Sequence, residues 1–504
     1  MQLFRPLAGQ EMPKGTLTME INRPSTKQTV AELDALIKQP IFSIAPEALK
    51  RYEEDYFEAK CQGSKAMIND AKEVIPGGVQ HNLAFNHPFP LVFTKAEGCM
   101  LEDIDGNQYL DFLQAGGPTV LGSNPPEIRE KVIELLNECG PSTGLLHEAE
   151  WKLAKLVTEL IPSVDWLRMF NSGSEGCAAA ARVARLATGH KNIVKMGGGY
   201  HGWSDMLAFG IRVPGSKWTQ SKGIPKSAFL HTQEYFPGDL EDLERVLKLN
   251  KVKGGTAAVF VEPVGPESGT RPISHEFILG ARDLAQKYGA LLVFDEVVTA
   301  FRLSPHGASS VYGVEPDLTV FGKVIAGGYP GAGGLGGKEE FRAYLAAGIH
   351  GDMKVKKALV GGTLAGTPLS ATAGYETIKR IAETGACEHA NAMGDRLTTG
   401  LRRIIKDRDL PFVAFNQGSI CHLEPVGTMH FSIDWSKPWT IPNVIKETSA
   451  RKSEMEHMGA AYMAEGIVTL AGSRLYTSAA YTEELIDEAL DRFDHVFSKV
   501  VKLS

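Results

Sequence analysis

The chain has 504 residues, of which 43% are hydrophobic and 22% are charged, and its formal net charge is −7. This composition is typical of a globular protein, and the length allows a large core and more than one domain. The negative charge argues against nucleic acid or an anionic membrane surface as the main partner.

The sequence also lacks the patterns of a membrane span, a secretory signal and a cysteine metal site. No apolar run approaches the roughly 20 residues that cross a bilayer, so we expect no membrane partner. The first residues lack the basic start and apolar stretch of a secretory signal. The six cysteines show no C-x-x-C spacing, so we expect no metal site and a cytoplasmic protein.

The amino-terminal part begins with an expected extension, residues 1–50, which contains one predicted short helix, Thr29–Lys38. Further on, Asp105-Gly106 lies between two strand-like runs, Met100–Ile104 and Tyr109–Phe112. An Asp-Gly pair between apolar runs predicts a β-hairpin.

A run of small polar residues follows the next predicted strand, Trp166–Phe170, and precedes an alanine-rich helix, Gly176–Thr188. Ser172 and Glu175 have the spacing of a capping box. The start of a helix with exposed N–H groups and small hydroxyls is also an anion site. The sequence therefore fits an ordinary helix cap and a phosphate site alike.

Tyr200 and His201 stand in a glycine-rich turn after the predicted strand Ile193–Lys195. Taken alone, the first is most simply a core tyrosine and the second a hydrogen-bonded structural histidine. Residues 205–239 are rich in Gly, Pro, Ser and Lys, which predicts a surface loop.

Three short apolar runs each lead to a charged residue, and their length and composition predict buried parallel strands. The runs with their charged residues are Thr256–Val261 with Glu262, Ala290–Phe294 with Asp295, and Leu318–Phe321 with Lys323. Ligands of open α/β sheets bind at the carboxyl ends of the strands, so these side chains are expected to meet in one crevice.

One chemistry needs this combination. A pyridine cofactor that acts as an electron sink needs a carboxylate beside its ring nitrogen, which Asp295 would provide. The Lys323 amine could hold the cofactor aldehyde as a Schiff base. The alternative is that Asp295 caps a helix and Lys323 is a solvated charge. The glycines around Lys323, among them Gly322 and Gly327, favour close approach to a ligand.

The part after residue 370 mixes predicted helices and strands, which predicts a carboxy-terminal α+β domain. The predicted elements are Ala371–Glu383, His389–Lys406, Phe412–Phe415, Ser419–His422, Met455–Glu465, Ile467–Leu470 and Glu483–Val500.

The stretch Asp295-Glu296-Val297, Phe301-Arg302, Pro316-Asp317-Leu318 and Gly322-Lys323 resembles the signature of class III (subgroup II) pyridoxal-phosphate-dependent aminotransferases. Within that family it is most similar to the branch of glutamate-1-semialdehyde aminomutases and β-amino-acid aminotransferases. The resemblance covers roughly residues 65–500.

The resemblance implies an α/β fold, the PLP-dependent transferase fold type I. This fold has a large mixed, mostly parallel sheet flanked by helices and a smaller α+β domain. The expected division is an extension at 1–50, the first part of the small domain at 51–115, a large cofactor domain at 116–370 and the rest of the small domain at 371–504.

The resemblance also implies pyridoxal 5'-phosphate as cofactor and a role for each matching residue. Lys323 would form the Schiff base, and Asp295 would pair with the ring nitrogen. The other implied cofactor contacts are Ser172, Gly173 and Ser174 at the phosphate, Tyr200 and Val297 on the ring faces, and Glu262 near the phenolic side. Thr363 matches the threonine that reaches the phosphate of the partner subunit, which implies a homodimer with active sites at the interface.

Substrate residues are less well defined by the sequence. Residues 115–118 lack the tryptophan of the aminomutase branch, and residues 80–85 lack its arginine. Arg474 is a candidate carboxylate ligand or a surface arginine, and His201 is a second candidate substrate contact. We therefore predict an aminotransferase that moves an amino group between an amine or amino acid, with β- or ω-amino compounds included, and a keto acid or other carbonyl acceptor.

Other functions stay open. An aminomutase of the glutamate-1-semialdehyde type or a racemase would share Lys323 and Asp295. A non-catalytic protein of the same fold or a nucleotide-binding α/β protein is a more remote alternative. Against the nucleotide alternative, no G-x-G-x-x-G follows the first strand and no Walker pattern is present.

Overall fold

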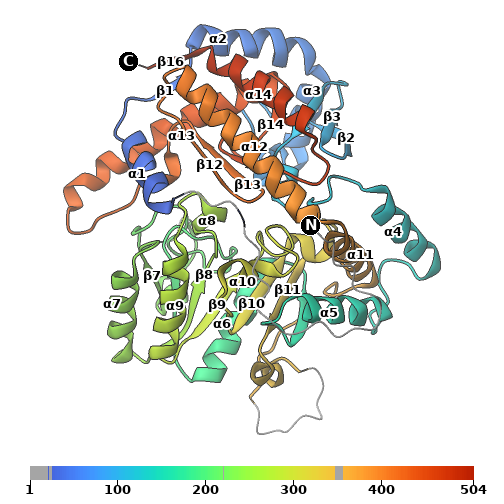
Figure 1. Cartoon of the computed structure of the whole chain (residues 1–504), viewed down its shortest axis with the longest axis vertical. Helices are drawn as coiled ribbons and strands as arrows, with labels where there is room; N and C mark the ends of the chain where they lie inside the picture. The colour runs from blue at the N-terminus through green and yellow to red at the C-terminus, as the bar shows by residue number, and fades with distance from the viewer. Residues whose placement is uncertain (1–20, 22–24, 219–220, 347–355, 504) are drawn as a thin grey trace, which may run out of the picture.

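The computed structural model describes residues 21, 25–218, 221–346 and 356–503. Its centre is a seven-stranded sheet in the order β5-β11-β10-β9-β8-β6-β7 (Figure 1). Only β11 is antiparallel to its neighbours β10 and β5, and the other pairs are parallel. The strands are β5 (Trp166–Phe170), β6 (Asn192–Met196), β7 (Thr232–Tyr235), β8 (Thr256–Val261), β9 (Leu291–Asp295), β10 (Leu318–Gly322) and β11 (Gly333–Gly337).

Helices cover both faces of this sheet, because successive side chains of each strand point to opposite sides. In β8, Val259 and Val261 pack in one core cluster with α7 (Leu240–Lys251) and α9 (His275–Lys287). The alternate residues Ala258 and Phe260 pack in another cluster with α6 (Gly173–Thr188). The predicted α/β fold with a large, mostly parallel sheet is confirmed.

Two strands of the large sheet were not predicted. The interpretation of 205–239 as a surface loop is wrong at Thr232–Tyr235, which forms β7 and pairs in parallel with β6. Its sequence, TQEY, is too short and polar to show a strand pattern. Strand β11 is Gly-Gly-Leu-Gly-Gly, whose glycines have no strand propensity. They are required by packing, because a Cβ on Gly333 would lie 2.3 Å from the carbonyl oxygen of Ser172.

A smaller α+β domain lies above the large sheet in Figure 1. It contains the sheets β14-β4-β3-β2 and β12-β13-β15. Its strands are β2 (Phe93–Glu97), β3 (Met100–Asp103), β4 (Gln108–Asp111), β12 (Val413–Gln417), β13 (Ile420–Glu424), β14 (Ile467–Val468) and β15 (Arg474–Tyr476). The predicted hairpin around Asp105-Gly106 is confirmed, since β3 and β4 pair antiparallel.

The remaining helices are α2 (Pro46–Arg51), α3 (Gln62–Val74), α4 (Pro126–Glu138), α5 (Glu148–Leu160), α8 (Pro266–Gly269), α10 (Gly307–Tyr312), α11 (Pro368–Thr384), α12 (Ala386–Asp407), α13 (Ile441–Ala464) and α14 (Glu483–Phe497). Helices α11, α12 and α14 overlap their predicted ranges, whereas α8 and α10 were not predicted. Helix α13 begins well before the predicted Met455. Its first turns bury few side chains, so they carry no amphipathic pattern. The domain boundaries at residues 116 and 371 stay a prediction.

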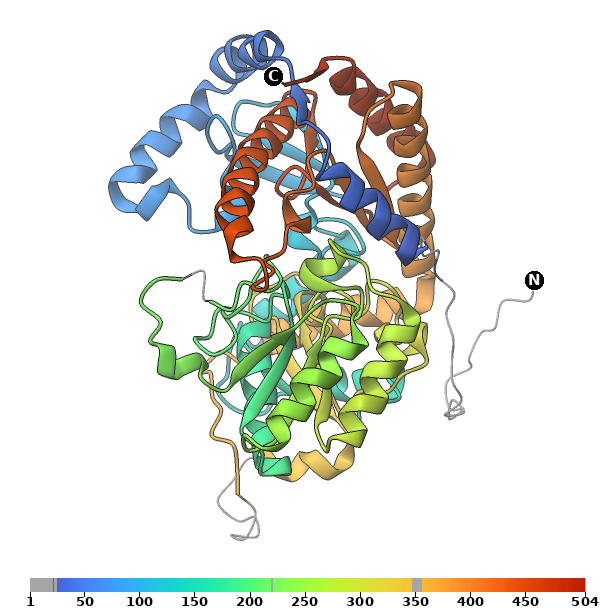
Figure 2. The ribbon, with the colours of Figure 1, turned by 90° about the vertical axis from the view of Figure 1, so that its left-hand side faces the viewer.

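Residues 1–20 and 22–24 of the predicted extension lie outside the described residues. Its described part forms α1 (Thr26–Leu36) and β1 (Phe42–Ile44), and β1 pairs with β16 (Val500–Lys502). Leu33 and Leu36 of α1 pack on Val413 and Phe415 of β12. Figure 2 shows α1 between the smaller domain and the helices of the large sheet. This part of the chain is therefore integrated into the fold.

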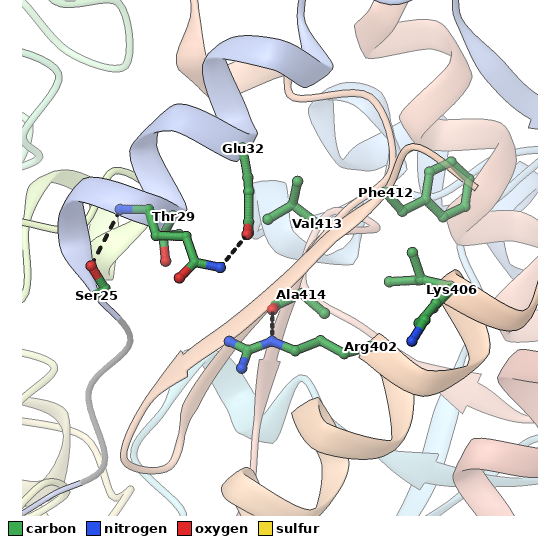
Figure 3. Close-up of a pocket in the computed structure, with 10 residues that line it drawn as sticks. Ser25, Thr29, Glu32, Arg402, Lys406, Phe412, Val413 and Ala414 are labelled. Atoms are coloured by element: carbon green, nitrogen blue, oxygen red, sulfur yellow. Dashed lines mark hydrogen bonds between the residues drawn. The ribbon is translucent and has the colours of Figure 1, made fainter. Parts of the chain in front are cut away.

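A surface groove of about 290 Å³ runs between α1 and the α12–β12 region (Figure 3). Arg402 lines it and donates from Nε to the carbonyl oxygen of Ala414 at 2.6 Å. None of the predicted site residues lines this groove. Within the described ranges, no helix is both long and apolar enough to span a bilayer.

Candidate active site

The predicted residues meet at the carboxyl ends of three adjacent strands. Glu262 follows β8, Asp295 ends β9, and Lys323 follows β10. Strands β9 and β10 are parallel neighbours in which Asp295 is opposite Val320. The crevice that the sequence predicts is therefore present at this edge of the sheet.

Lys323 has a strained backbone and a perturbed amine. Its φ is 48°, a left-handed conformation that is uncommon for a residue with a side chain. Its Nζ donates to the carbonyl oxygen of Gly116. Burial and, after it, the charges of Arg474 and Arg302 lower the pKa of the amine to about 8. A substantial fraction of the amine is therefore neutral near physiological pH.

Asp295 receives donors from three directions. Its Oδ2 lies 2.7 Å from Nδ1 of His201 and 3.3 Å from Sγ of Cys177, and its Oδ1 accepts the N–H of Val297 at 3.1 Å. Burial lowers the pKa of His201, so we assign a neutral ring whose Nδ1 proton faces the carboxylate. His201 is thus buried and hydrogen-bonded to Asp295, as expected of a structural histidine.

The start of α6 combines both interpretations of its sequence. Ser172 is the N-cap, and its Oγ accepts the N–H of Glu175 at 3.3 Å. The helix start remains partly exposed at residues 172–174, so its other N–H groups and the Ser174 hydroxyl are accessible to an anion. A helix cap and an anion site are therefore compatible here.

Val297 ties the start of α6 to the end of β10. A Cβ on Gly173 would lie 2.5 Å from Cγ2 of Val297, and a Cβ on Gly322 would lie 2.7 Å from its Cγ1. Only glycine at these two positions leaves room for the valine. The valine, the predicted phosphate residues and the lysine are consequently held in one packed unit.

Glu262 supports the turn that carries Tyr200. Its Oε1 accepts the N–H groups of Tyr200 and Glu267 at 2.9 and 3.0 Å, and its Oε2 accepts that of Ser268 at 2.9 Å. Burial, together with the charge of Asp295, raises the pKa of Glu262 to about 8. The side chain of Tyr200 is 48% exposed, which leaves a ring free to stack on a ligand.

Arg474 is an internal residue of the site and not a surface arginine. Its Nη1 lies 3.3 Å from Oε2 of Glu267 and donates to the carbonyl oxygen of the same residue at 3.2 Å. Its charge also acts on the Lys323 amine. Thr363, in contrast, is exposed in the loop before α11, where the neighbouring Gly362 packs against Asn171.

Sequence reasoning assigned no individual role to several residues of this region. Arg302 is fully buried and joins two segments by donating to the carbonyl oxygens of Gly117 at 2.9 Å and Thr477 at 2.8 Å. Lys195 is also buried and donates to two carbonyl oxygens at 2.7 Å on either side of the Tyr200 turn. A charged residue inside an apolar strand was the signal for Lys195. Neither Cys177 nor Glu267 had such a signal.

Comparisons with known proteins agree with this geometry. The family model "Aminotransferase class-III" matches residues 83–497. A glutamate-1-semialdehyde 2,1-aminomutase of Desulforapulum autotrophicum is 36% identical over 438 residues, which cover 85% of this chain and 96% of that protein.

Solved structures show the same fold. An omega-transaminase from Sphaerobacter thermophilus superimposes with a TM-score of 0.77 at 25% identity, covering 88% of this chain and 99% of that one. A transaminase with PLP bound has a TM-score of 0.75 at 24% identity, covering 87% and 97%. The chain belongs to the class III aminotransferase family of pyridoxal-phosphate-dependent enzymes, with the fold type I architecture.

Proposed function

We propose that this enzyme is an aminotransferase that moves an amino group between an amine or amino acid and a keto acid or other carbonyl acceptor. β- and ω-amino compounds are included among the donors. One observation carries the proposal. On neighbouring strands, a Lys323 amine with a lowered pKa stands beside an Asp295 carboxylate that accepts hydrogen bonds from three groups.

The residues present fit pyridoxal 5'-phosphate. Lys323 offers an amine for covalent attachment, and Asp295 offers an oxygen for the ring nitrogen. Ser172, Gly173 and Ser174 would hold the phosphate at the start of α6. Tyr200 and Val297 would contact the ring, and Glu262 would hold the Tyr200 turn in place. The glycines at 173 and 322 support this fit, because they let Val297 pack between the start of α6 and the residue before Lys323.

Each residue then has a defined task. Bound pyridoxal phosphate supplies an aldehyde and a pyridine ring that accepts electrons. Asp295 would hold a proton at the ring nitrogen, and His201 would fix the orientation of that carboxylate. Lys323 would be the general base, and its lowered pKa suits proton transfer near neutral pH.

Arg474 is the proposed ligand for a substrate carboxylate. Its guanidinium group is held by Glu267, and a substrate carboxylate would compete with Glu267 for it. A substrate without a carboxylate would leave this ion pair intact. Arg474 therefore allows both kinds of substrate at one site.

A homodimer is proposed from Thr363 and its surroundings. Thr363 is exposed and would complete the phosphate site of a partner subunit. The nearby leucines Leu145, Leu146 and Leu364 are 81%, 83% and 58% exposed. The loops that carry them are adjacent, since the N–H of Leu369 donates to the carbonyl oxygen of Pro141 at 3.3 Å. Exposed leucines on adjacent loops are expected of a surface that another chain covers.

The second candidate is a glutamate-1-semialdehyde type aminomutase, because a relative 36% identical to this chain is a glutamate-1-semialdehyde 2,1-aminomutase. The two reactions differ in stoichiometry. A transaminase consumes an amino acceptor, whereas an aminomutase isomerises one molecule and needs none.

The test combines spectra and products. We expect the purified protein to be yellow with pyridoxal phosphate, to be bleached by borohydride, and to lose the yellow species in Lys323→Ala. Screening amines with a keto acid acceptor should show stoichiometric acceptor consumption. Turnover of glutamate 1-semialdehyde without any acceptor would replace the aminotransferase proposal with the aminomutase. A protein that never becomes yellow would exclude both.

A further inference from the structure

Asp295 is held by an unusual set of donors for a buried carboxylate. The imidazole of His201 and the thiol of Cys177 both point to Oδ2, at 2.7 and 3.3 Å. Oδ1 accepts only the backbone N–H of Val297, at 3.1 Å, among the described residues. A carboxylate oxygen has about two acceptor positions, so Oδ2 is saturated and Oδ1 has one position left.

The environment of Cys177 keeps its thiol protonated, so that the S–H group can donate a hydrogen bond. Cys177 lies on the first turns of α6 and is 1% exposed. Burial and the charge of Asp295 raise the pKa of the thiol well above its usual value. The proton therefore stays on sulfur, and the S–H group faces a buried carboxylate.

We propose that Cys177 is a positioning residue for Asp295, whose thiol occupies Oδ2 so that Oδ1 is the oxygen presented to the cofactor ring nitrogen. The proposal deepens the function proposed above and rests on it. Cys177 is not a catalytic residue, because its sulfur touches Asp295 and acts through it.

The consequence concerns the proton that Asp295 shares with the ring nitrogen. Hydrogen bonds to an ionised carboxylate stabilise that charged form. With the thiol and the imidazole both in place, the carboxylate stays ionised and the proton stays on the ring nitrogen. Without the thiol, the charged form loses one of its three donors, and the proton shifts toward Asp295. The ring then accepts electrons less well.

Three variants separate this role from packing. Cys177→Ala removes the donor, and Cys177→Ser keeps a donor of similar size. Cys421→Ala removes another fully buried thiol, from the smaller domain, and is the matched control. Thermal unfolding of the cofactor-free proteins establishes that each variant is folded before binding is compared.

The first readout is cofactor affinity, measured by titrating each cofactor-free protein with pyridoxal phosphate. Loss of one hydrogen bond to a charged group is expected to weaken binding about five- to tenfold in Cys177→Ala. Cys177→Ser should bind within about twofold of wild type, and Cys421→Ala should be unchanged. Equal weakening in the alanine and serine variants would overturn the proposal, because packing alone would then explain the effect.

The second readout is the nitrogen-15 chemical shift of ring-labelled pyridoxal phosphate, which reports ring protonation directly. It should move toward the unprotonated value in Cys177→Ala and return in Cys177→Ser. An infrared difference spectrum should also show a hydrogen-bonded S–H band that Cys177→Ala removes. A chemical shift that does not move in Cys177→Ala would refute the positioning role.

Asp295→Asn separates a failure of the role of Cys177 from a failure of the role proposed for Asp295. If this variant changes ring protonation and Cys177→Ala does not, only the role of the thiol fails. If Asp295→Asn leaves ring protonation unchanged, the assignment of Asp295 in the proposed function fails as well.

Discussion

The amine of Lys323 donates to the carbonyl oxygen of Gly116, which joins the end of β10 to the turn that follows β4. Gly116 has a φ of 83°, and a Cβ there would lie 3.5 Å from Nζ of Lys323. The turn therefore approaches the lysine through a bare backbone. It holds the amine in the crevice, where burial and two arginines change its protonation.

Cofactor uptake should depend on pH through Lys323. The pKa of its amine is about 8, so the neutral, nucleophilic form increases as the pH rises through this value. We expect the rate at which cofactor-free protein binds pyridoxal phosphate covalently to increase from pH 7 to 9, with a midpoint near 8. Stopped-flow absorbance measures it.

Arg474→Met separates this assignment from titration of Lys195, whose pKa is also about 8, because the charge of Arg474 acts on Lys323. Removing the arginine removes a positive charge beside the amine, so the midpoint should move upward. An unchanged midpoint would assign the titration to another group.

Freeing Arg474 should strengthen carboxylate binding. Glu267→Gln removes the ion pair at 3.3 Å, so a substrate carboxylate no longer competes with a charged partner. We expect the KM for a carboxylate-bearing substrate to fall severalfold in this variant and to rise at least tenfold in Arg474→Met. The KM for a neutral amine donor should be similar in all three proteins. A parallel change for both donor types would contradict the role of Arg474.

Glu424 should make the fold less stable at high pH. It is fully buried, and neither carboxyl oxygen has a hydrogen-bond partner among the described residues. Burial raises its pKa to about 8, which Arg474 partly offsets. Because the folded-state pKa exceeds the unfolded one, its stabilisation is complete below pH 4 to 5 and is lost as the pH rises through 8.

Glu424→Gln tests this linkage. The neutral amide cannot ionise. In denaturant unfolding, the free energy of unfolding of the variant should therefore increase relative to that of wild type between pH 5 and 8. The difference should reach on the order of 2–4 kcal/mol at pH 9. A difference that is constant with pH would show that Glu424 does not titrate in this range.

Packing around Val297 should control cofactor binding. In Gly173→Ala the new Cβ would lie 2.5 Å from a methyl group of Val297, so one of the two must shift. We expect a loss of roughly 1–3 kcal/mol in stability and weaker binding of pyridoxal phosphate. Adding Val297→Ala should restore much of the stability, which a double-mutant cycle by thermal unfolding would measure. Additive losses would show that the two residues do not share this space.

The leucine surface should control assembly. Leu146→Lys places a charge on a side chain that is 83% exposed, so it should cost little in the fold but disrupt a subunit contact. Sedimentation should show dimers for wild type and monomers for the variant, with weaker cofactor binding. If the variant remains dimeric and binds normally, another surface forms the interface.

Local patterns in the sequence were sufficient for most elements and for the positions of the reactive groups. Strands β5 and β8 have the predicted bounds, because each is a short and mostly apolar run. Asp295 and Lys323 follow apolar runs whose length and composition predict buried strands, and parallel strands place their carboxyl ends together. The sequence did not predict the strand within 205–239 or the first half of α13, because the apolar pattern is weak in both segments.

The sequence by itself determined which charged groups stand at the strand ends, and therefore the chemistry of the site. Only the tertiary structure decided how those groups are tuned. Cys177 meets Asp295, Glu267 meets Arg474, and Gly116 meets Lys323 across 118, 207 and 207 residues of chain. Such contacts depend on how sheets and loops pack at long range, and no periodicity or local motif in one sequence encodes them.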